Sequence, residues 1–372
     1  MLFQAHPMAF GKTKSRLSPI GIDFGADSLK LLQIVPGDPP ELVALGSATL
    51  PEDARTDLNA RLAFLNEALP SLLRRHGFKQ KRVMLSIPAF QTMVNNLLIS
   101  RGDAKEIDGQ VDLALRTRLN LEPSRMVIRN YPGIEVFRDS IPKQEVITFA
   151  AHRDVVMQYI DLANRLKLEV AGMHCEAPCV LRAFSHLNPS EASDTQRTIA
   201  FIDLGAATTK IIVSRGEKML LAKTIHAGGD QWTRRLASEQ DMDFAEARLA
   251  RVAEASGDSS AVAVAPAPAS DTSEHACETT ECLIDELGLT FRHYHARYPE
   301  QPIEKIVFIG GEAHRIQTCQ QLARSVHVAA QLGDPFARLS RLNATSPTGI
   351  DLAQPQPGWA VALGLCLSEA NL

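Results

Sequence analysis

The most constraining feature of this sequence is an internal repeat. Residues 20–34 align without a gap on residues 200–214, 180 positions later, and each segment reads as two apolar strands joined by a glycine-containing bend. Ser28 is matched by another hydroxyl residue, Thr208. The residues that recur are Ile22, Asp23, Gly25, Ala26 and Lys30, matched by Ile202, Asp203, Gly205, Ala206 and Lys210. A repeat in register over this length predicts two related domains, each beginning with the same hairpin.

The bend in each copy has the chemistry of an anion site. Gly25 and Gly205 let backbone N–H groups approach a phosphate with no Cβ in the way. The hydroxyl groups of Ser28, Thr208 and Thr209 add further donors. We therefore expect the two hairpins to face each other and clamp a polyphosphate.

A carboxylate ends the first strand of each copy. Asp23 and Asp203 are anions and do not bind a phosphate directly. They can hold the waters of a Mg²⁺ ion, which neutralises the phosphate charge. Ala26, Ala206 and Lys30 share the same bends and belong to the expected phosphate site. The alternative is a duplicated scaffold without ligand, since aspartate and glycine are favoured in any tight turn and the hydroxyl and lysine side chains can cap turns or face solvent.

Two glycine pairs extend the predicted site. Gly310 and Gly311 follow a strand and open a helix, so their amides are placed to meet the adenosine or an adjacent phosphate. Gly228 and Gly229 open another helix after the strands of the second repeat, where they act either as a helix cap or as a nucleotide contact.

The order of strand and helix patterns predicts an α/β chain with two duplicated domains and a small inserted α+β unit. Leucines at spacings of three and four over residues 58–72 predict a helix facing a sheet. Helical patterns also cover residues 231–254, 277–298, 313–326 and 358–367. The expected parts are a flexible tail (1–18), domain I (19–90 and 173–195), an inserted subdomain (91–172) and domain II (196–372), which contains a mobile loop (255–275).

Composition limits the partners. With 372 residues, a formal net charge of -4 and a sequence pI near 6.3, the chain has room for two cores and no overall basic field that favours nucleic acid. Its sequence has no apolar run long enough to span a bilayer and no secretory signal, and its six cysteines show no regular framework. We expect a cytoplasmic protein that does not itself cross the membrane.

These motifs resemble those of the actin, sugar kinase and heat-shock chaperone superfamily, whose ribonuclease H-like domains enclose a nucleotide cleft. The similarity rests on residues 23–25, 203–209 and 309–311, and extends to residues 83–88, 228–230 and 362–365. Within the superfamily, the sequence is most similar to the PilM-like proteins of type IV pilus assembly, which share an extra subdomain in the first half with FtsA-like proteins.

The resemblance implies that ATP and Mg²⁺ bind in the cleft, with Glu246 near the ribose. Glu312 stands beside the Gly310-Gly311 turn where relatives often have a small residue, so its side chain is placed to crowd or redirect the base. The implied partner is the cytoplasmic tail of a PilN-like inner-membrane protein, which would hold the chain at the membrane periphery.

The first functional hypothesis is thus a scaffold that switches by nucleotide-dependent domain closure, with slow or absent ATP hydrolysis. A sugar or acetate kinase of the same superfamily is a second, although it needs a carboxylate base beside a substrate hydroxyl. An FtsA-like filament protein and a nucleotide-free pseudo-actin are further alternatives, and homo-oligomers remain open.

Overall fold

The computed structural model describes residues 17–138, 140–187, 196–256, 263–264, 278–340 and 350–371. The predicted tail (1–18) and the predicted loop (255–275) lie largely outside these residues. The strands are β1 (Ile20–Phe24), β2 (Ser28–Val35), β3 (Glu41–Thr49), β4 (Arg82–Ile87), β5 (Met93–Ser100), β6 (Met126–Arg138), β7 (Ile141–His152), β8 (Glu169–Cys175), β9 (Thr198–Leu204), β10 (Thr209–Arg215), β11 (Lys218–Ile225), β12 (Ala263–Val264), β13 (Lys305–Ile309) and β14 (Ala330–Leu332). The helices are α1 (Asp53–Thr56), α2 (Leu58–Arg75), α3 (Ala104–Leu119), α4 (Arg153–Arg165), α5 (Glu176–Ala183), α6 (Gly229–Gln240), α7 (Phe244–Ser256), α8 (Glu278–Arg297), α9 (Ile316–Ser325) and α10 (Ala360–Cys366).

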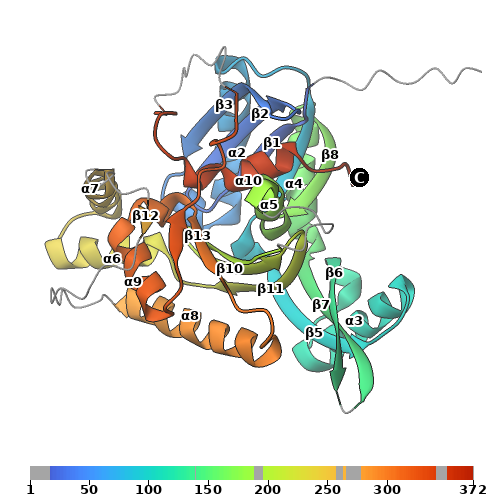
Figure 1. The fold of residues 1–372 in the computed structure, drawn as a ribbon. Helices are drawn as coiled ribbons and strands as arrows, with labels where there is room; N and C mark the ends of the chain where they lie inside the picture. The colour runs from blue at the N-terminus through green and yellow to red at the C-terminus, as the bar shows by residue number, and fades with distance from the viewer. Residues whose placement is uncertain are drawn as a thin grey trace, which may run out of the picture.

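Two sheets share one topology. The first has the strand order β3-β2-β1-β4-β8, and the second has the order β11-β10-β9-β13-β14-β12. In each, three strands form an antiparallel meander, a fourth strand pairs in parallel with its first strand, and a fifth pairs in parallel with the fourth. The second sheet adds β12, which is antiparallel to β14. The sequence repeat is therefore a structural repeat, and the two sheets form the two lobes of the molecule (Figure 1).

The register of the two hairpins places the repeated charges together. Asp23 lies opposite Lys30 across β1 and β2, and Asp203 lies opposite Lys210 across β9 and β10. Residues directly opposite in an antiparallel pair share one face of the sheet. Each lobe thus presents an acid and a lysine side by side at the end of its first strand.

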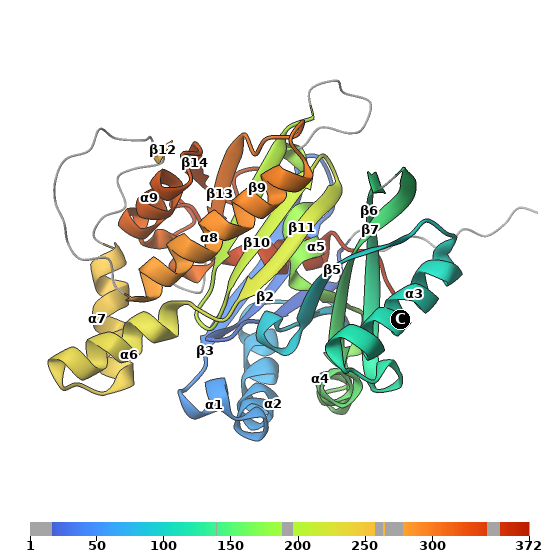
Figure 2. The same cartoon turned by 90° about the horizontal axis from the view of Figure 1, so that it is seen from below.

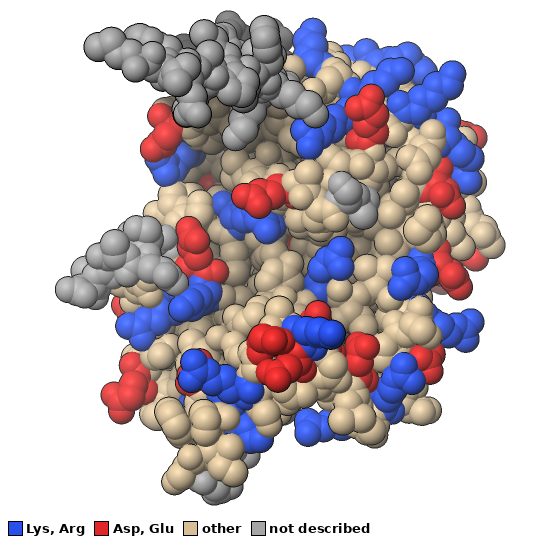
Figure 3. Space-filling model, turned by 90° about the vertical axis from the view of Figure 1, so that its right-hand side faces the viewer, with Lys and Arg blue, Asp and Glu red and all other residues tan. Residues whose placement is uncertain are grey.

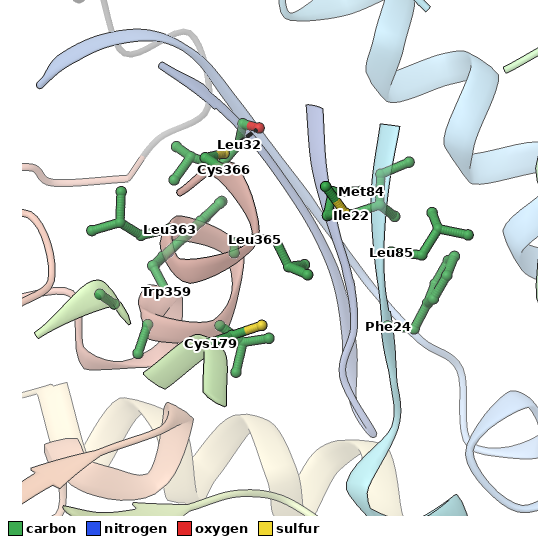
Figure 4. Close-up of a cluster of buried hydrophobic side chains, with 14 of the residues drawn as sticks. Ile22, Phe24, Leu32, Met84, Leu85, Cys179, Trp359, Leu363, Leu365 and Cys366 are labelled. Carbon is green, nitrogen blue, oxygen red and sulfur yellow. Dashed lines mark hydrogen bonds between the residues drawn. The ribbon is translucent and has the colours of Figure 1, made fainter. Parts of the chain in front are cut away.

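Helix α10 lies in the range expected for domain II but packs on the first lobe. It contacts β1, β2 and α5, and all its residues are buried. A Cβ on Gly21 of β1 would lie 2.6 Å from the carbonyl oxygen of Ala362. Figure 4 shows Leu365 and Cys366 facing one side of this sheet, with Phe24 and Leu85 on the other side. A helix that is apolar all round needs cover on every side, and the first lobe supplies it.

The opposite face of the first sheet carries α2 and α4 (Figure 2). The predicted leucine stripe of α2 is buried at Leu65, Leu69 and Leu72, and the ring of Tyr159 on α4 stacks on Phe24 with centroids 4.8 Å apart. In the second lobe, α8 buries Leu283, Leu287 and Phe291 in the core beneath it, with residues of β9, β10 and β13.

One helix prediction was wrong. The pattern over residues 231–254 predicted a single helix, but the chain forms α6 and α7. Asp241 takes a left-handed conformation with φ 53° and ends α6. Asp243 then accepts a hydrogen bond from the backbone N–H of Glu246 and starts α7.

The connection from β4 to β8 contains the inserted unit, a sheet of order β5-β7-β6 with α3 packed against it. The side chain of Asn96 on β5 donates to the carbonyl of Ala222 on β11 and accepts from its N–H. The face of the molecule in Figure 3 carries acidic and basic side chains interspersed rather than one charged field. Within the described part of the chain, no helix combines the length and apolar character needed to cross a bilayer.

Candidate functional site

The two hairpin bends face one narrow cleft between the lobes, which encloses a volume of about 60 Å³ and is partly open to solvent. The structure brings most of the predicted site residues to this cleft. Those that line it are Asp23, Gly25, Ala26, Lys30, Asp203, Gly205, Ala206, Thr208, Gly310 and Gly311. Ser28, Thr209, Gly228, Gly229 and Glu246 lie outside its lining.

The two bends have matching geometry. A Cβ on Gly25 would lie 2.8 Å from the carbonyl oxygen of Ser28, and one on Gly205 would lie 2.8 Å from that of Thr208. This contact is closer than a Cβ tolerates, so each bend requires glycine. The tight turn leaves backbone N–H groups without partners: among the described residues, those of Ala26 and Ala206 donate no hydrogen bond. Unpaired amides at two facing bends are the donors that a phosphate chain needs.

The carbonyl groups behind the two bends are satisfied in different ways. In the first lobe, the buried guanidinium of Arg61 on α2 donates to the carbonyls of Phe24, Gly25 and Ala26. In the second lobe, the first amides of α6 do this work. Gly229 N–H donates to Gly205 at 3.0 Å, and Asp230 N–H donates to Ala206 at 2.8 Å. The structure therefore places the Gly228-Gly229 pair behind the bend, where it supports the bend from outside the cleft.

The hydroxyl residues divide between the cleft and the backbone. Thr208 is buried and lines the cleft, and its hydroxyl has no hydrogen-bond partner in the described part of the chain. Thr209 instead donates to the carbonyl of Ala227 at 2.8 Å, and Ser28 donates to Asp27 at 3.0 Å. Thr208 is thus the hydroxyl best placed to donate to a ligand.

Asp23 is buried at the bottom of the cleft, where it accepts a hydrogen bond from Ser86 at 3.1 Å. Burial raises the pKa of the Asp23 carboxyl to about 6; the charge of Lys30 opposes this rise, and the Glu176 carboxylate adds to it. A carboxyl with this pKa changes its charge readily when a cation binds nearby.

Lys210 joins two carboxylates across the cleft. Its Nζ lies 2.8 Å from Asp203 and is also hydrogen-bonded to Glu176. Burial alone would lower the pKa of Lys210, but the carboxylates of Asp203 and Glu176 outweigh it and raise the pKa. Lys210 therefore stays charged and links β10 of the second lobe to α5.

Glu176 is a cleft residue that the sequence analysis missed. It is the first residue of α5, directly after β8, and it also accepts a hydrogen bond from the N–H of Ala89 at 2.8 Å. A signal was present: β8 and β1 belong to the same sheet and both run parallel to β4, so their carboxyl ends meet at one edge. The acid after β8 is thereby brought to the edge that carries Asp23.

A second set of charges connects the lobes beside the cleft. Arg55 on α1 lies 2.7 Å from Asp230 on α6, and Arg248 on α7 lies 2.8 Å from Asp27 in the first bend. The Arg55 guanidinium also lies over the ring of Phe244, 5.3 Å from its centroid. Burial would raise the pKa of Asp27, but Lys30 and Arg248 lower it to about 2, so this carboxylate is charged at neutral pH.

The far side of the cleft holds a buried ion pair. Glu312, next to the Gly310-Gly311 turn, is hydrogen-bonded through both carboxylate oxygens to Arg251 on α7. Gly310 has φ 94°, and a Cβ there would overlap the Asp203 carboxylate. Glu246, expected near the ribose, is exposed and caps its own helix with Asp243.

The fit of Mg²⁺ and a nucleotide to this site has two parts. The phosphate end fits, because the two bends leave amides and the Thr208 hydroxyl without partners and face two aspartates whose waters could hold Mg²⁺. The base end does not fit as readily, since the Glu312 carboxylate, held by Arg251, lines the cleft next to the Gly310-Gly311 turn.

Comparison with solved structures gives the fold. The "PilM-PilN type IV pilus biogenesis complex" is 20% identical to this chain, with a TM-score of 0.75 and coverage of 95% of this chain and 98% of that chain. The ethanolamine utilization protein EutJ from Carboxydothermus hydrogenoformans is 14% identical, with a TM-score of 0.45 and coverage of 95% and 90%. The actin-like α/β fold class predicted from the sequence is confirmed.

The sequence profile of the family described as "Type IV pilus assembly protein PilM" matches residues 21–370, which includes both lobes and the inserted unit. This range covers both duplicated hairpins and the cleft between them. The chain therefore belongs to the PilM family of type IV pilus assembly proteins.

Proposed function

We propose that this chain is a cytoplasmic pilus assembly protein that docks the tail of a PilN-like inner-membrane protein, and that nucleotide-dependent closure of the lobes changes how strongly the tail is held. Family membership and the likeness to a PilM-PilN complex support the pilus role. Magnesium would neutralise the phosphate charge, held through waters on Asp23 and Asp203.

A second hollow supports a docking place for the tail. It encloses a volume of about 370 Å³ and lies between β6, α5 and the β10–β11 turn. Apolar side chains of Tyr131, Leu181 and Met219 contribute to its lining. Strand β6 is at the edge of its sheet, so an extended tail has backbone groups to pair with as well as an apolar surface to cover.

The observation that carries the proposal is that α5 borders both places. Its first residue, Glu176, is bonded to Lys210 in the cleft, while Pro178, Leu181 and Arg182 line the hollow. Strand β10 likewise carries Lys210 to the cleft and leads into the turn at Gly216 beside the hollow. A ligand that competes for Lys210 would act on both walls of the hollow, which is how a cleft ligand can bias a distant surface.

Binding of a fluorescently labelled tail peptide, followed by anisotropy with and without Mg-ATP, tests the proposal. We expect the peptide Kd to differ at least about fivefold between the two states. Glu176→Gln should reduce this difference while the peptide still binds, because the link from α5 to Lys210 is weakened. Leu181→Glu should remove peptide binding and leave Mg-ATP binding in place.

Leu113→Glu is the matched control, since Leu113 is 60% exposed on α3, away from the hollow. A peptide Kd that is the same with and without Mg-ATP would refute the switch. Equal peptide binding by the Leu181 and Leu113 variants would refute the docking place.

A further inference from the structure

Glu312 lines the cleft beside the Gly310-Gly311 turn, which the sequence assigned to the adenosine or an adjacent phosphate, and Arg251 forms a buried pair with it. Arg251 is 5% exposed and Glu312 is 9% exposed. Both carboxylate oxygens of Glu312 accept from the guanidinium, and Arg251 Nε donates to Thr233 on α6 at 3.0 Å. Both oxygens of the Glu312 carboxylate and all three nitrogens of the Arg251 guanidinium therefore have hydrogen-bond partners inside the protein.

The backbone around this pair is shaped to receive it. A Cβ on Gly229 would overlap the Glu312 carboxylate, so the carboxylate lies directly on the start of α6. Thr233, which accepts from Arg251, donates in turn to the carbonyl of Gly229 at 2.9 Å. These contacts form a closed network from α7 through Glu312 to the first turn of α6.

Such a pair is hard to displace by a neutral ring. A buried guanidinium that loses its carboxylate is left charged and unpaired, and removing one partner of a buried pair is strongly unfavourable. Burial would lower the pKa of Arg251, but the hydrogen bonds and charge of Glu312 raise it, so the guanidinium stays charged. A purine can form hydrogen bonds with Arg251 or with Glu312. It carries no charge, so it cannot replace the partner that either residue would lose.

We propose that the cleft binds a Mg-bound polyphosphate chain through its phosphates alone, with Arg251 and Glu312 standing in the place of the base. Nucleoside triphosphates then bind without regard to the base, and inorganic tripolyphosphate binds as tightly as ATP. This inference rests on the proposed phosphate site at the two bends, and it concerns which ligand that site selects.

Calorimetry on the full chain with Mg²⁺ tests the inference by comparing ATP, GTP and inorganic tripolyphosphate. We expect Kd values within about threefold of one another, because all three present the same phosphates to the bends. The double variant Arg251→Ala with Glu312→Ala removes the buried pair next to the Gly310-Gly311 turn and should gain at least a tenfold preference for ATP over tripolyphosphate. The double variant Arg235→Ala with Glu239→Ala removes an exposed pair of the same kind on α6 and should leave the three Kd values together.

The outcomes separate this inference from the proposed function. Wild-type protein that prefers ATP to tripolyphosphate tenfold or more overturns the inference alone, since the phosphate site then works and the base is recognised. Binding of none of the three ligands overturns the phosphate site and the inference with it. The wild-type comparison decides the question even where the cleft variant does not fold.

Discussion

The ionised form of Asp23 lowers the free energy of unfolding at neutral pH, because its carboxyl is buried. Its raised folded pKa, about 6, means that the folded protein favours the protonated carboxyl more than the unfolded chain does. The stability that this preference contributes is complete below the unfolded pKa near 4 and is lost as pH rises through about 6. A cation that binds beside Asp23 stabilises its ionised form and so offsets the cost of burying this charge. Groups that serve a binding site often lower stability in this way.

Asp23→Asn is expected to stabilise the protein at pH 8 but not at pH 4. The asparagine keeps the size of the neutral acid without the buried charge, so the free energy of unfolding should rise by on the order of 2 kcal/mol at pH 8. Thermal melts at the two pH values measure this, with Asp112→Asn on the exposed face of α3 as the control. The same gain at both pH values would contradict the assigned pKa. The variant should also lose the Mg²⁺ dependence of triphosphate binding.

At the scale of elements, the two hairpins show what the sequence allows one to predict. The repeat predicted both bends, and the donors that each bend offers to a phosphate predicted that they face each other; both line one cleft. The support behind each bend was not predictable from the repeat. Arg61 serves one bend and the amides of α6 serve the other, so the same carbonyls are satisfied by residues that have no common pattern.

Two other features could not be predicted from the sequence because they depend on tertiary contacts. The break between α6 and α7 occurs at Asp241, which takes a left-handed conformation. Nothing in the helical pattern marks this residue as the end of a helix. Glu312 was recognised as an unusual neighbour of the Gly310-Gly311 turn. Its partner Arg251 lies 61 positions away, and no periodicity connects them.

The second bend gives a direct test of the shared hairpin geometry. Gly205→Ala adds a Cβ that meets the Thr208 carbonyl at 2.8 Å, so the bend must open and its amides must turn. We expect Mg-triphosphate affinity to fall at least tenfold, with a loss of about 1–2 kcal/mol in the free energy of unfolding. Gly109→Ala in α3 meets nothing within 4 Å and should instead stabilise by about 0.5–1 kcal/mol. Unchanged triphosphate affinity in the Gly205 variant would remove this bend from the site.

At the scale of the whole molecule, the lobes are joined in two unlike ways. On the inner side, α5 and α10 pack between the sheets, and the core of the first lobe continues into Phe201, Ile212 and Val307 of the second sheet. The ring of Phe184 lies 5.5 Å from that of Phe201. Close-packed apolar contacts of this kind resist separation. We therefore expect the lobes to move relative to each other about this shared core.

The other connection is ionic and lies beside the cleft, in the pairs Arg55–Asp230 and Arg248–Asp27. We expect the lobes to hinge about the apolar core, and we call these two ion pairs the latch. Opening requires the latch to break and the Lys210–Glu176 bond in the cleft to rearrange. The Asp230 carboxylate also belongs to the first turn of α6, whose amides support the second bend. Opening at the latch is thereby coupled to the geometry of the phosphate site.

Arg55→Ala should therefore open the lobes without unfolding either one. Small-angle scattering should show a larger radius of gyration, and hydrogen exchange should increase in α1 and in the first turn of α6 while the strands of both sheets stay protected. A double-mutant cycle with Asp230→Ala should give a coupling energy of about 1–3 kcal/mol, because the pair is nearly buried, with side-chain exposures of 4% and 10%. The exposed pair of Arg116 and Glu122 on the inserted unit, 3.2 Å apart, should give less than about 1 kcal/mol in the same cycle. If exchange instead rises evenly over both sheets, the contact stabilises the fold as a whole and does not act as a latch.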